Sequence, residues 1–214
     1  MSNFRYYRPS NFPPITKNLI IINVLVWITQ LIFDKQYDIT DKLALYPIGT
    51  PMFKPYQIAT HMFAHASYDG AGNIIFYHIL FNMFALWMFG RILENVWGGK
   101  RFLLFYLICG VGAALVHLTV QYFTGSYSAA IGASGAIMGI FAAFAYLFPN
   151  TELFILFIPI PIKAKWAVLG LAAYDLFGGY SGSDNVAHFA HLGGALTGFI
   201  LVLIWNKTNR KKFY

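Results

Sequence analysis

Six stretches of the chain are apolar over enough residues to suggest helices that cross a membrane. A crossing helix needs about 20 mainly apolar residues. The stretches span residues 19–33, 72–93, 102–123, 131–148, 164–177 and 186–205. The first and the fifth are short, so we expect their helices to extend into flanking residues. The pattern predicts an all-α membrane protein, built as a bundle of six transmembrane helices.

Two connecting segments have features of their own. Residues 153–162 are apolar, but Pro159 and Pro161 rule out a continuous helix, so we expect a connector at the membrane surface. Residues 34–71 form the longest connection and are rich in aromatic, apolar and proline residues. A connection of that length usually has a function or a structure of its own. We expect it to lie in the membrane interface, where it either gates access or acts as a passive cap.

The distribution of basic residues predicts how the helices are oriented, since Lys and Arg concentrate in cytoplasmic segments. A cytoplasmic N-terminus places three of the fifteen basic residues outside, at Lys35, Lys42 and Lys54, and leaves twelve inside. Six spans then put both basic termini in the cytoplasm. We therefore predict a cytoplasmic segment at residues 1–18, a membrane domain at 19–205 and a basic cytoplasmic tail at 206–214.

Composition and charge narrow the function classes. Of the 214 residues, 58% are hydrophobic and 11% are charged, whereas soluble domains carry about 25% charged residues. The net charge of +7 is best explained by topology and by contact with anionic lipid, not by nucleic-acid binding. The single cysteine, Cys109, excludes an intrachain disulfide. No signal peptide or transit-like segment is evident before the first span, so we expect that span to be retained and the location to be a bacterial plasma membrane.

Polar side chains inside predicted spans are candidate functional residues, because burying them in a membrane is costly. His78 and Asn82 lie four residues apart, so they share one helix face. They could donate hydrogen bonds to one oxygen, or simply join helices. His188 and His191 open the last span, and Ser134 opens the fourth within the sequence Ile-Gly-Ala-Ser-Gly.

Glycine spacing connects the serine to one of these histidines. Gly135 and Gly139 follow Ser134, and Gly194 and Gly198 follow His191, each pair in the small-xxx-small spacing that lets helices approach closely. Two such helices can pack backbone to backbone, which would bring the serine and the histidine within hydrogen-bond reach. The alternative is glycine packing with an incidental serine and histidine.

The remaining ionisable groups offer weaker candidates. His61 and His65 are four apart and could bind a metal, but local hydrogen bonding at the interface is the better interpretation. His117 is assigned to packing or to a hydrogen bond. No carboxylate is expected at the depth of the serine, since Asp175 and Asp184 should face solvent.

Several motifs in order resemble the rhomboid family of intramembrane serine proteases. They are H-x-x-x-N at His78 and Asn82; E-x-x-x-G-x-x-x-F at Glu94, Gly98 and Phe102, followed by Tyr106; G-x-S-G at Gly132, Ser134 and Gly135; and A-H-x-G-G from Ala190 to Gly194. The resemblance covers roughly residues 60–205. It implies six helices, with the serine at the head of the fourth, and cleavage of transmembrane segments of membrane-protein substrates by a Ser–His dyad without a cofactor.

Carried onto this chain, the resemblance implies Ser134 as nucleophile and His191 as general base. It implies an oxyanion hole formed by His78, Asn82 and the Ser134 backbone N–H, with structural support from Gly132, Gly135, Gly139, Gly194, Gly198 and Glu94. Two positions depart from the family pattern. A Trp-Arg pair in the first external loop is here Tyr56-Gln57, and an aromatic residue that stacks on the histidine is here Met138.

Two other functions remain open at this stage. A non-catalytic rhomboid-like membrane scaffold would carry the same fold, although such relatives usually lack the serine or the histidine, and both are present here. A metal site or transporter built from His61, His65, His188 and His191 would lack the expected carboxylates or cysteines. We therefore predict no metal in the site.

Overall fold

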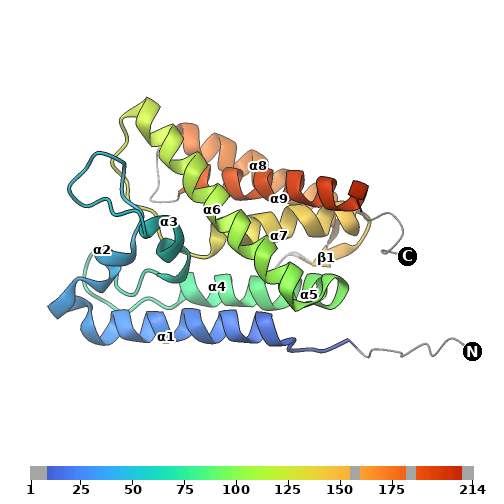
Figure 1. Ribbon diagram of the computed structural model, residues 1–214, viewed down its shortest axis with the longest axis horizontal. Helices are drawn as coiled ribbons and strands as arrows, with labels where there is room; N and C mark the ends of the chain where they lie inside the picture. The colour runs from blue at the N-terminus through green and yellow to red at the C-terminus, as the bar shows by residue number, and fades with distance from the viewer. Residues whose placement is uncertain (1–8, 155–159, 182–186, 209–214) are drawn as a thin grey trace, which may run out of the picture.

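The computed structural model describes residues 9–154, 160–181 and 187–208. Its helices and strands, in chain order, are α1 (Pro14–Tyr37), α2 (Ile39–Leu43), α3 (Gln57–Thr60), η1 (His61–Phe63), α4 (Tyr77–Ala85), η2 (Leu86–Gly90), α5 (Arg91–Trp97), α6 (Gly99–Thr124), α7 (Ser134–Leu147), β1 (Glu152–Phe154), β2 (Pro161–Lys163), α8 (Ala164–Ser181) and α9 (His188–Thr208). Figure 1 shows their arrangement. Residues 1–8, 155–159, 182–186 and 209–214 lie outside the described part. The predictions for Asp184 and for most of the basic tail therefore concern residues that the structure does not describe.

Each of the six predicted stretches contains a helix, with shifted ends. Helix α1 is longer than its apolar run because Pro13 and Pro14 provide its N-cap and its first turn, where a missing N–H costs nothing. The second stretch begins five residues later than predicted, at Tyr77, and continues through the single π-helical turn η2 to Trp97. The connector at residues 153–162 is not helical: β1 and β2 pair as an antiparallel hairpin, with Leu153 opposite Ile162.

The prediction for residues 131–148 is wrong at its start, since α7 begins at Ser134 and has 14 residues. Gly132 has a φ of 121°, which interrupts the helix and which a residue with a side chain rarely adopts. At 1.5 Å per residue, α7 is about 21 Å long, shorter than the roughly 30 Å of a hydrocarbon core. Gly132 and Ala133, which precede the helix, are buried, and non-helical backbone is tolerated in a membrane where it lies inside the protein.

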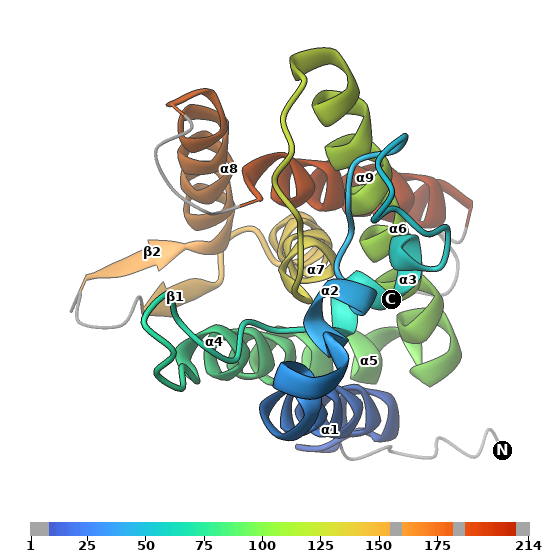
Figure 2. The ribbon, with the colours of Figure 1, turned by 90° about the vertical axis from the view of Figure 1, so that its left-hand side faces the viewer.

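Helix α7 is the centre of the bundle. It packs against α6, α8 and α9, and Figure 2 shows it end-on with other helices around it. Phe89 of the η2 turn packs edge-to-face against Phe141 and Phe144 of α7, with ring centroids 4.7 and 4.9 Å apart. The fully buried side chains Phe102, Phe105 and Tyr106 belong to the same core.

The outer helix α1 shows the burial pattern expected of a protein surrounded by lipid. Its buried residues include Asn23 and Gln30, whereas Ile21, Leu25 and Ile32 are exposed. The Gln30 side chain exchanges two hydrogen bonds of 3.0 Å with the backbone of His65. Polar groups must find partners inside a membrane protein, while apolar side chains can face the acyl chains. Among the residues that the structure describes, four helical segments are long and apolar enough to cross a membrane: Pro14–Tyr37, Tyr77–Trp97, Gly99–Thr124 and His188–Lys207.

The long connection is more structured than a loop. Residues 34–37 belong to α1, and α2, α3 and η1 occupy part of the rest. Gln57 is 1% exposed, and its side chain accepts a hydrogen bond from Lys54 N (3.0 Å) and donates one to Met52 O (3.0 Å). Its neighbour Tyr56 is exposed. Gln57, at one of the two positions that depart from the family pattern, therefore holds the connection together from within.

Glu94, predicted to give structural support, caps a distant helix. Its carboxylate accepts hydrogen bonds from the backbone N–H of Ile15 (2.9 Å) and from both the N–H and the hydroxyl of Thr16 (2.7 Å each). The first N–H groups of a helix have no partner within it, and a negative charge at that end is favourable. Glu94 thereby fixes the start of α1 against α5.

Candidate active site

The serine and histidine at the starts of α7 and α9 are in direct contact. Nε2 of His191 lies 2.8 Å from Oγ of Ser134, although the two residues are 57 positions apart. His191 is partly exposed, with 19% of its side chain accessible. An imidazole nitrogen at this distance can take the proton of the hydroxyl, which is otherwise a weak nucleophile.

The glycines predicted to pack the two helices do so. A methyl group on Gly194 would overlap the carbonyl oxygen of Gly135, and one on Gly198 would lie 2.6 Å from Cα of Gly139. Neither atom can move without shifting helix backbone. Helices α7 and α9 thus meet backbone to backbone, which sets the separation of Ser134 and His191.

The expectation for Asp175 is wrong. Its residue is 3% exposed, and its Oδ1 lies 2.9 Å from Nδ1 of His191 and 2.8 Å from Nδ1 of His188. The sequence shows no sign of this contact because Asp175 lies on α8, 16 residues before His191, at the end of a predicted span where solvent exposure is the usual interpretation. The packing of α8 against α9 turns this carboxylate inward.

His78 approaches the serine turn from α4. A methyl group on Gly132 would lie 2.8 Å from Nε2 of His78, so only glycine leaves room for the ring. Nδ1 of His78 accepts a hydrogen bond of 3.1 Å from Ala66 N. A neutral imidazole that accepts at one nitrogen carries its proton on the other. Nε2–H of His78 is therefore a donor close to Ser134.

Asn82 lies one turn further along α4 and is 7% exposed. Its Nδ2 donates to the carbonyl oxygen of His78 at 2.8 Å. An amide nitrogen carries two hydrogens, so one N–H is left for another acceptor. Ser134 itself is the first residue of α7, where backbone N–H groups have no partner within the helix.

A cavity of about 530 Å³ adjoins these groups. Of its lining residues in the described part of the chain, three are polar: Asn82, Ser134 and His191. The apolar remainder comes from α4 and the η2 turn on one side, from α7, and from β1 and α8 on the other: Phe81, Phe84, Ala85, Met88, Phe89, Ile137, Met138, Phe141, Phe144, Leu153, Phe154, Ala167, Val168 and Leu171. Met138 lines this cavity, and polar support for the His191 ring comes from Asp175.

His61 and His65 lie in the long connection, beside the turn that precedes α7. Nδ1 of His61 contacts the carbonyl oxygen of Gln57 at 2.9 Å, and the carbonyl oxygen of His61 accepts from Gly132 N at the same distance. Burial lowers the pKa of His61 to about 4 and the pKa of His65 to about 3. Both rings are therefore neutral at pH 7, and local hydrogen bonding describes His61 better than metal binding does.

The alternative metal set of His61, His65, His188 and His191 does not come together in the described residues. Among the residues that the structure describes, the only group of three or more His, Cys, Asp or Glu side chains with converging ligand atoms is Asp175, His188 and His191. His61 and His65 are not part of it. His117 is buried in α6, and neither of its ring nitrogens has a hydrogen-bond partner within the described chain.

The sequence of this chain is similar to those of known proteins. The model of the rhomboid domain family matches residues 53–207. The human presenilin-associated rhomboid-like protein, mitochondrial, is 32% identical over 193 residues, covering 87% of this chain and 48% of that protein. Rhomboid-like protein 11, chloroplastic, of Arabidopsis thaliana is 35% identical over 161 residues, 71% of this chain and 53% of that protein.

A third relative is rhomboid protein 1, mitochondrial, of Saccharomyces cerevisiae, which is 31% identical over 127 residues, 58% of this chain and 37% of that protein. The chain thus spans about half the length or less of the curated relatives it matches. The family model nevertheless covers most of the chain, from the long connection through α9. By this match this integral membrane protein belongs to the rhomboid family.

Proposed function

We propose that the protein is an intramembrane serine endopeptidase that cleaves transmembrane segments of other membrane proteins. The observation that carries the proposal is the 2.8 Å contact between Nε2 of His191 and Oγ of Ser134, at the edge of the apolar cavity. Family membership supports it, since rhomboid proteins are generally intramembrane proteases. The alternative of a non-catalytic scaffold does not account for a serine and a histidine held at hydrogen-bond distance.

In this proposal His191 acts first as base and then as acid. Nε2 takes the hydroxyl proton as Oγ of Ser134 attacks the substrate carbonyl carbon, forming a tetrahedral intermediate. The imidazolium then gives that proton to the leaving amine, so the peptide C–N bond breaks and an acyl-enzyme remains. Water, activated by the same nitrogen, attacks the ester carbonyl and releases the new carboxyl end together with free Ser134.

The negative oxygen of the intermediate needs donors already in place. In this proposal the donors are Nε2–H of His78, the second amide N–H of Asn82 and the backbone N–H of Ser134 at the start of α7. The positive end of the α7 dipole adds to them. Donors of this kind are worth about 3–4 kcal/mol each in the transition state.

The cavity matches an apolar substrate segment. Fourteen of its lining residues are apolar, and the three polar ones are the proposed nucleophile, the base and an oxyanion donor. Apolar side chains of a transmembrane segment can therefore pack against α4 and α8 while one of its peptide groups reaches Ser134. We expect the physiological substrate to be a membrane protein that contains such a transmembrane segment.

The direct test is reconstitution into liposomes with a candidate single-span substrate. We expect the wild-type protein to release two fragments and the Ser134→Ala variant, folded to the same extent, to release none. A fluorophosphonate probe, which reacts with activated serines, should label the wild type only. Equal cleavage by the two proteins would contradict the proposal, and a wild type that neither cleaves nor labels would favour the scaffold.

His78→Ala and Asn82→Ala should each lower kcat by roughly 10²-fold or somewhat more, with little change in KM. The reason is that their donors act on charge that develops in the transition state. Probe labelling should persist but slow down, because the Ser134–His191 pair is intact. Thermal unfolding of both variants provides the control for packing, and folded variants with wild-type turnover would show that these side chains only join helices.

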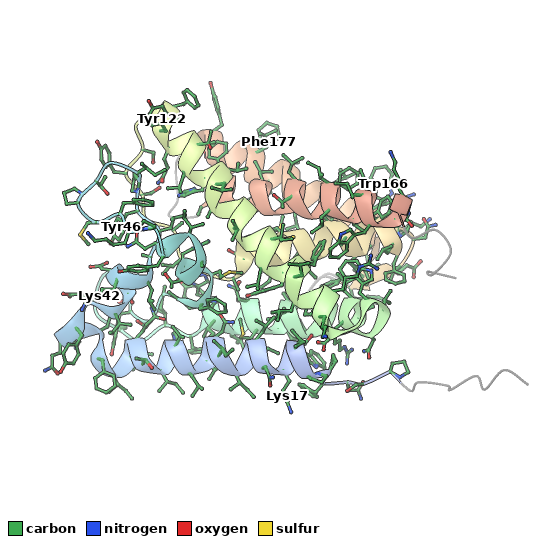
Figure 3. The ribbon with its side chains drawn as sticks, viewed as in Figure 1. Lys17, Lys42, Tyr46, Tyr122, Trp166 and Phe177 are labelled. Atoms are coloured by element: carbon green, nitrogen blue, oxygen red, sulfur yellow. The ribbon has the colours of Figure 1, made fainter. Side chains whose placement is uncertain are left out.

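We also propose the six-span arrangement with both termini in the cytoplasm. The start of α1 and the end of α9 lie at the same end of the molecule, and Lys42 lies at the other end (Figures 1 and 3). In a Cys109→Ala background, a membrane-impermeant thiol reagent added outside intact cells should label Lys42→Cys and not Lys207→Cys. Labelling of Lys207→Cys alone would show that the topology is the reverse of the one proposed.

The membrane proposed for this topology is the plasma membrane of a bacterium. The relatives' names assign those proteins to mitochondria and chloroplasts. Fractionation of a bacterial host that expresses the chain should recover it with the inner membrane, in a form that alkaline carbonate does not extract. Recovery in the soluble fraction would contradict this location.

A further inference from the structure

The base of the proposed protease needs one defined tautomer. Nε2 of His191 can accept the Ser134 proton only if the hydrogen of the neutral ring is on Nδ1. Nδ1 of His191 lies 2.9 Å from Oδ1 of Asp175. A carboxylate only accepts hydrogen bonds, so this contact selects the ring form that leaves Nε2 free to act on the serine.

The fold buries Asp175 in a helix that otherwise buries almost nothing. Ala164 and Asp175 are the only buried residues of α8, while Trp166, Leu169 and Phe177 are 59–73% exposed. In a membrane, this apolar face can lie against the acyl chains while the polar side chain finds partners inside the protein. Burying a carboxylate is costly unless hydrogen bonds compensate, and Asp175 has such partners in His188 and His191.

A second histidine holds the carboxylate in place. Nδ1 of His188 lies 2.8 Å from the same Oδ1, and its residue is 3% exposed. Gly178, one turn after Asp175, lets the helices approach, because a methyl group there would lie 2.5 Å from the His188 ring. His188 therefore holds in place the same oxygen of Asp175 that faces His191.

We propose that Asp175 is the positioning residue of a Ser134–His191–Asp175 relay, with His188 holding the carboxylate. This proposal rests on the proposed function and extends it from a dyad to a triad. Asp175 touches neither the substrate nor the serine. It holds the His191 ring with Nδ1–H toward the carboxylate and stabilises the imidazolium after proton transfer. The carboxylate thereby supplies orientation of the His191 ring in a chain where Met138 replaces the family's stacking aromatic residue.

The decisive variant is Asp175→Asn, which keeps shape and removes charge. Steady-state cleavage in liposomes should show a fall in kcat of roughly 10²- to 10⁴-fold, the upper figure being the loss known for the same change in a soluble serine protease. KM should stay within about twofold, because the cavity that holds substrate is untouched. Asp175→Glu, which restores a carboxylate, should recover part of the lost kcat.

A spectroscopic measurement reads the tautomer independently of turnover. In Ser134→Ala protein labelled with ¹⁵N-histidine, nuclear magnetic resonance should show His191 protonated at Nδ1, and Asp175→Asn in that background should lose this signature. Glu94→Gln is the matched control, since Glu94 is also a buried carboxylate, 3% exposed, that accepts backbone hydrogen bonds away from the site. It should lower the melting temperature and leave kcat of the folded protein unchanged.

Each contrary result has a distinct meaning. An active wild type with an equally active Asp175→Asn variant overturns the positioning role and leaves the protease intact. A kcat loss of the same size in Glu94→Gln overturns it as well, because the effect would then be one of stability. Loss of wild-type turnover in a chelator would make the three side chains metal ligands instead. A wild type that neither cleaves nor labels overturns the proposed function first.

Discussion

His191→Ala is expected to reduce peptide-bond cleavage by at least about 10⁴-fold, whereas His188→Ala should retain measurable turnover. Removing the base takes away the described partner of Oγ of Ser134, which lies at 2.8 Å. Losses of this size follow when the nucleophile or base of a serine protease is deleted. His188 contacts Asp175. The His188→Ala change therefore lets the carboxylate of Asp175 move but does not remove the base.

Initial rates of substrate cleavage and the rate of fluorophosphonate labelling measure this difference. Both variants should be compared with wild type at equal folded concentration, judged by size-exclusion chromatography in detergent. Similar loss in the two variants would show that the histidines act as a unit. An inactive His188→Ala protein beside an active His191→Ala protein would reverse their roles.

Gly194→Ala should prevent stable assembly of the bundle, although the substitution adds one methyl group. That group would overlap the carbonyl oxygen of Gly135, which is backbone and cannot rotate away. Inserting extra atoms into a packed core typically costs about 1–3 kcal/mol and occasionally more. Separation of α7 from α9 would also pull His191 away from Ser134, so any folded fraction should be inactive.

Gly170→Ala is the matched control for this substitution. Gly170 lies within α8 with no atom near the position that a methyl group would take. Alanine is favoured over glycine inside helices by about 1 kcal/mol, so this variant should melt at the same temperature or higher. A Gly194→Ala protein that unfolds like wild type in a thermal scan would show that the helices are not held by this contact.

The parts of the fold that the sequence predicted are those with a local signal. Runs of apolar residues located the helices, and glycine spacing within single helices located the contact between α7 and α9. The start of α7 was missed by three residues, because a φ of 121° at Gly132 is a property of its packing beside His78. A glycine in an apolar run gives no indication of which conformation it will take.

The residues of the candidate site that the sequence predicted are likewise those with a local signal, and the residue it missed is Asp175. Ser134, His191, His78 and Asn82 stand in recognisable motifs, and the structure brings them together. Asp175 stands in no motif, and its inward position depends on how α8 is rotated against α9. Rotation of one helix about its axis is set by contacts between distant residues, which periodicity in a single sequence does not contain.

The cap that Glu94 places on α1 has a consequence for the order of synthesis. The chain is made from its N-terminus, and the carboxylate that completes the first helix lies 78 residues after Thr16. While the ribosome adds those residues, the amide groups of Ile15 and Thr16 have water or lipid headgroups as their partners. The first span can insert early, but the start of α1 is capped only after Glu94 of α5 has been synthesised. A nascent chain that ends before Glu94 should therefore expose its α1 amides to hydrogen exchange, and one that includes it should protect them.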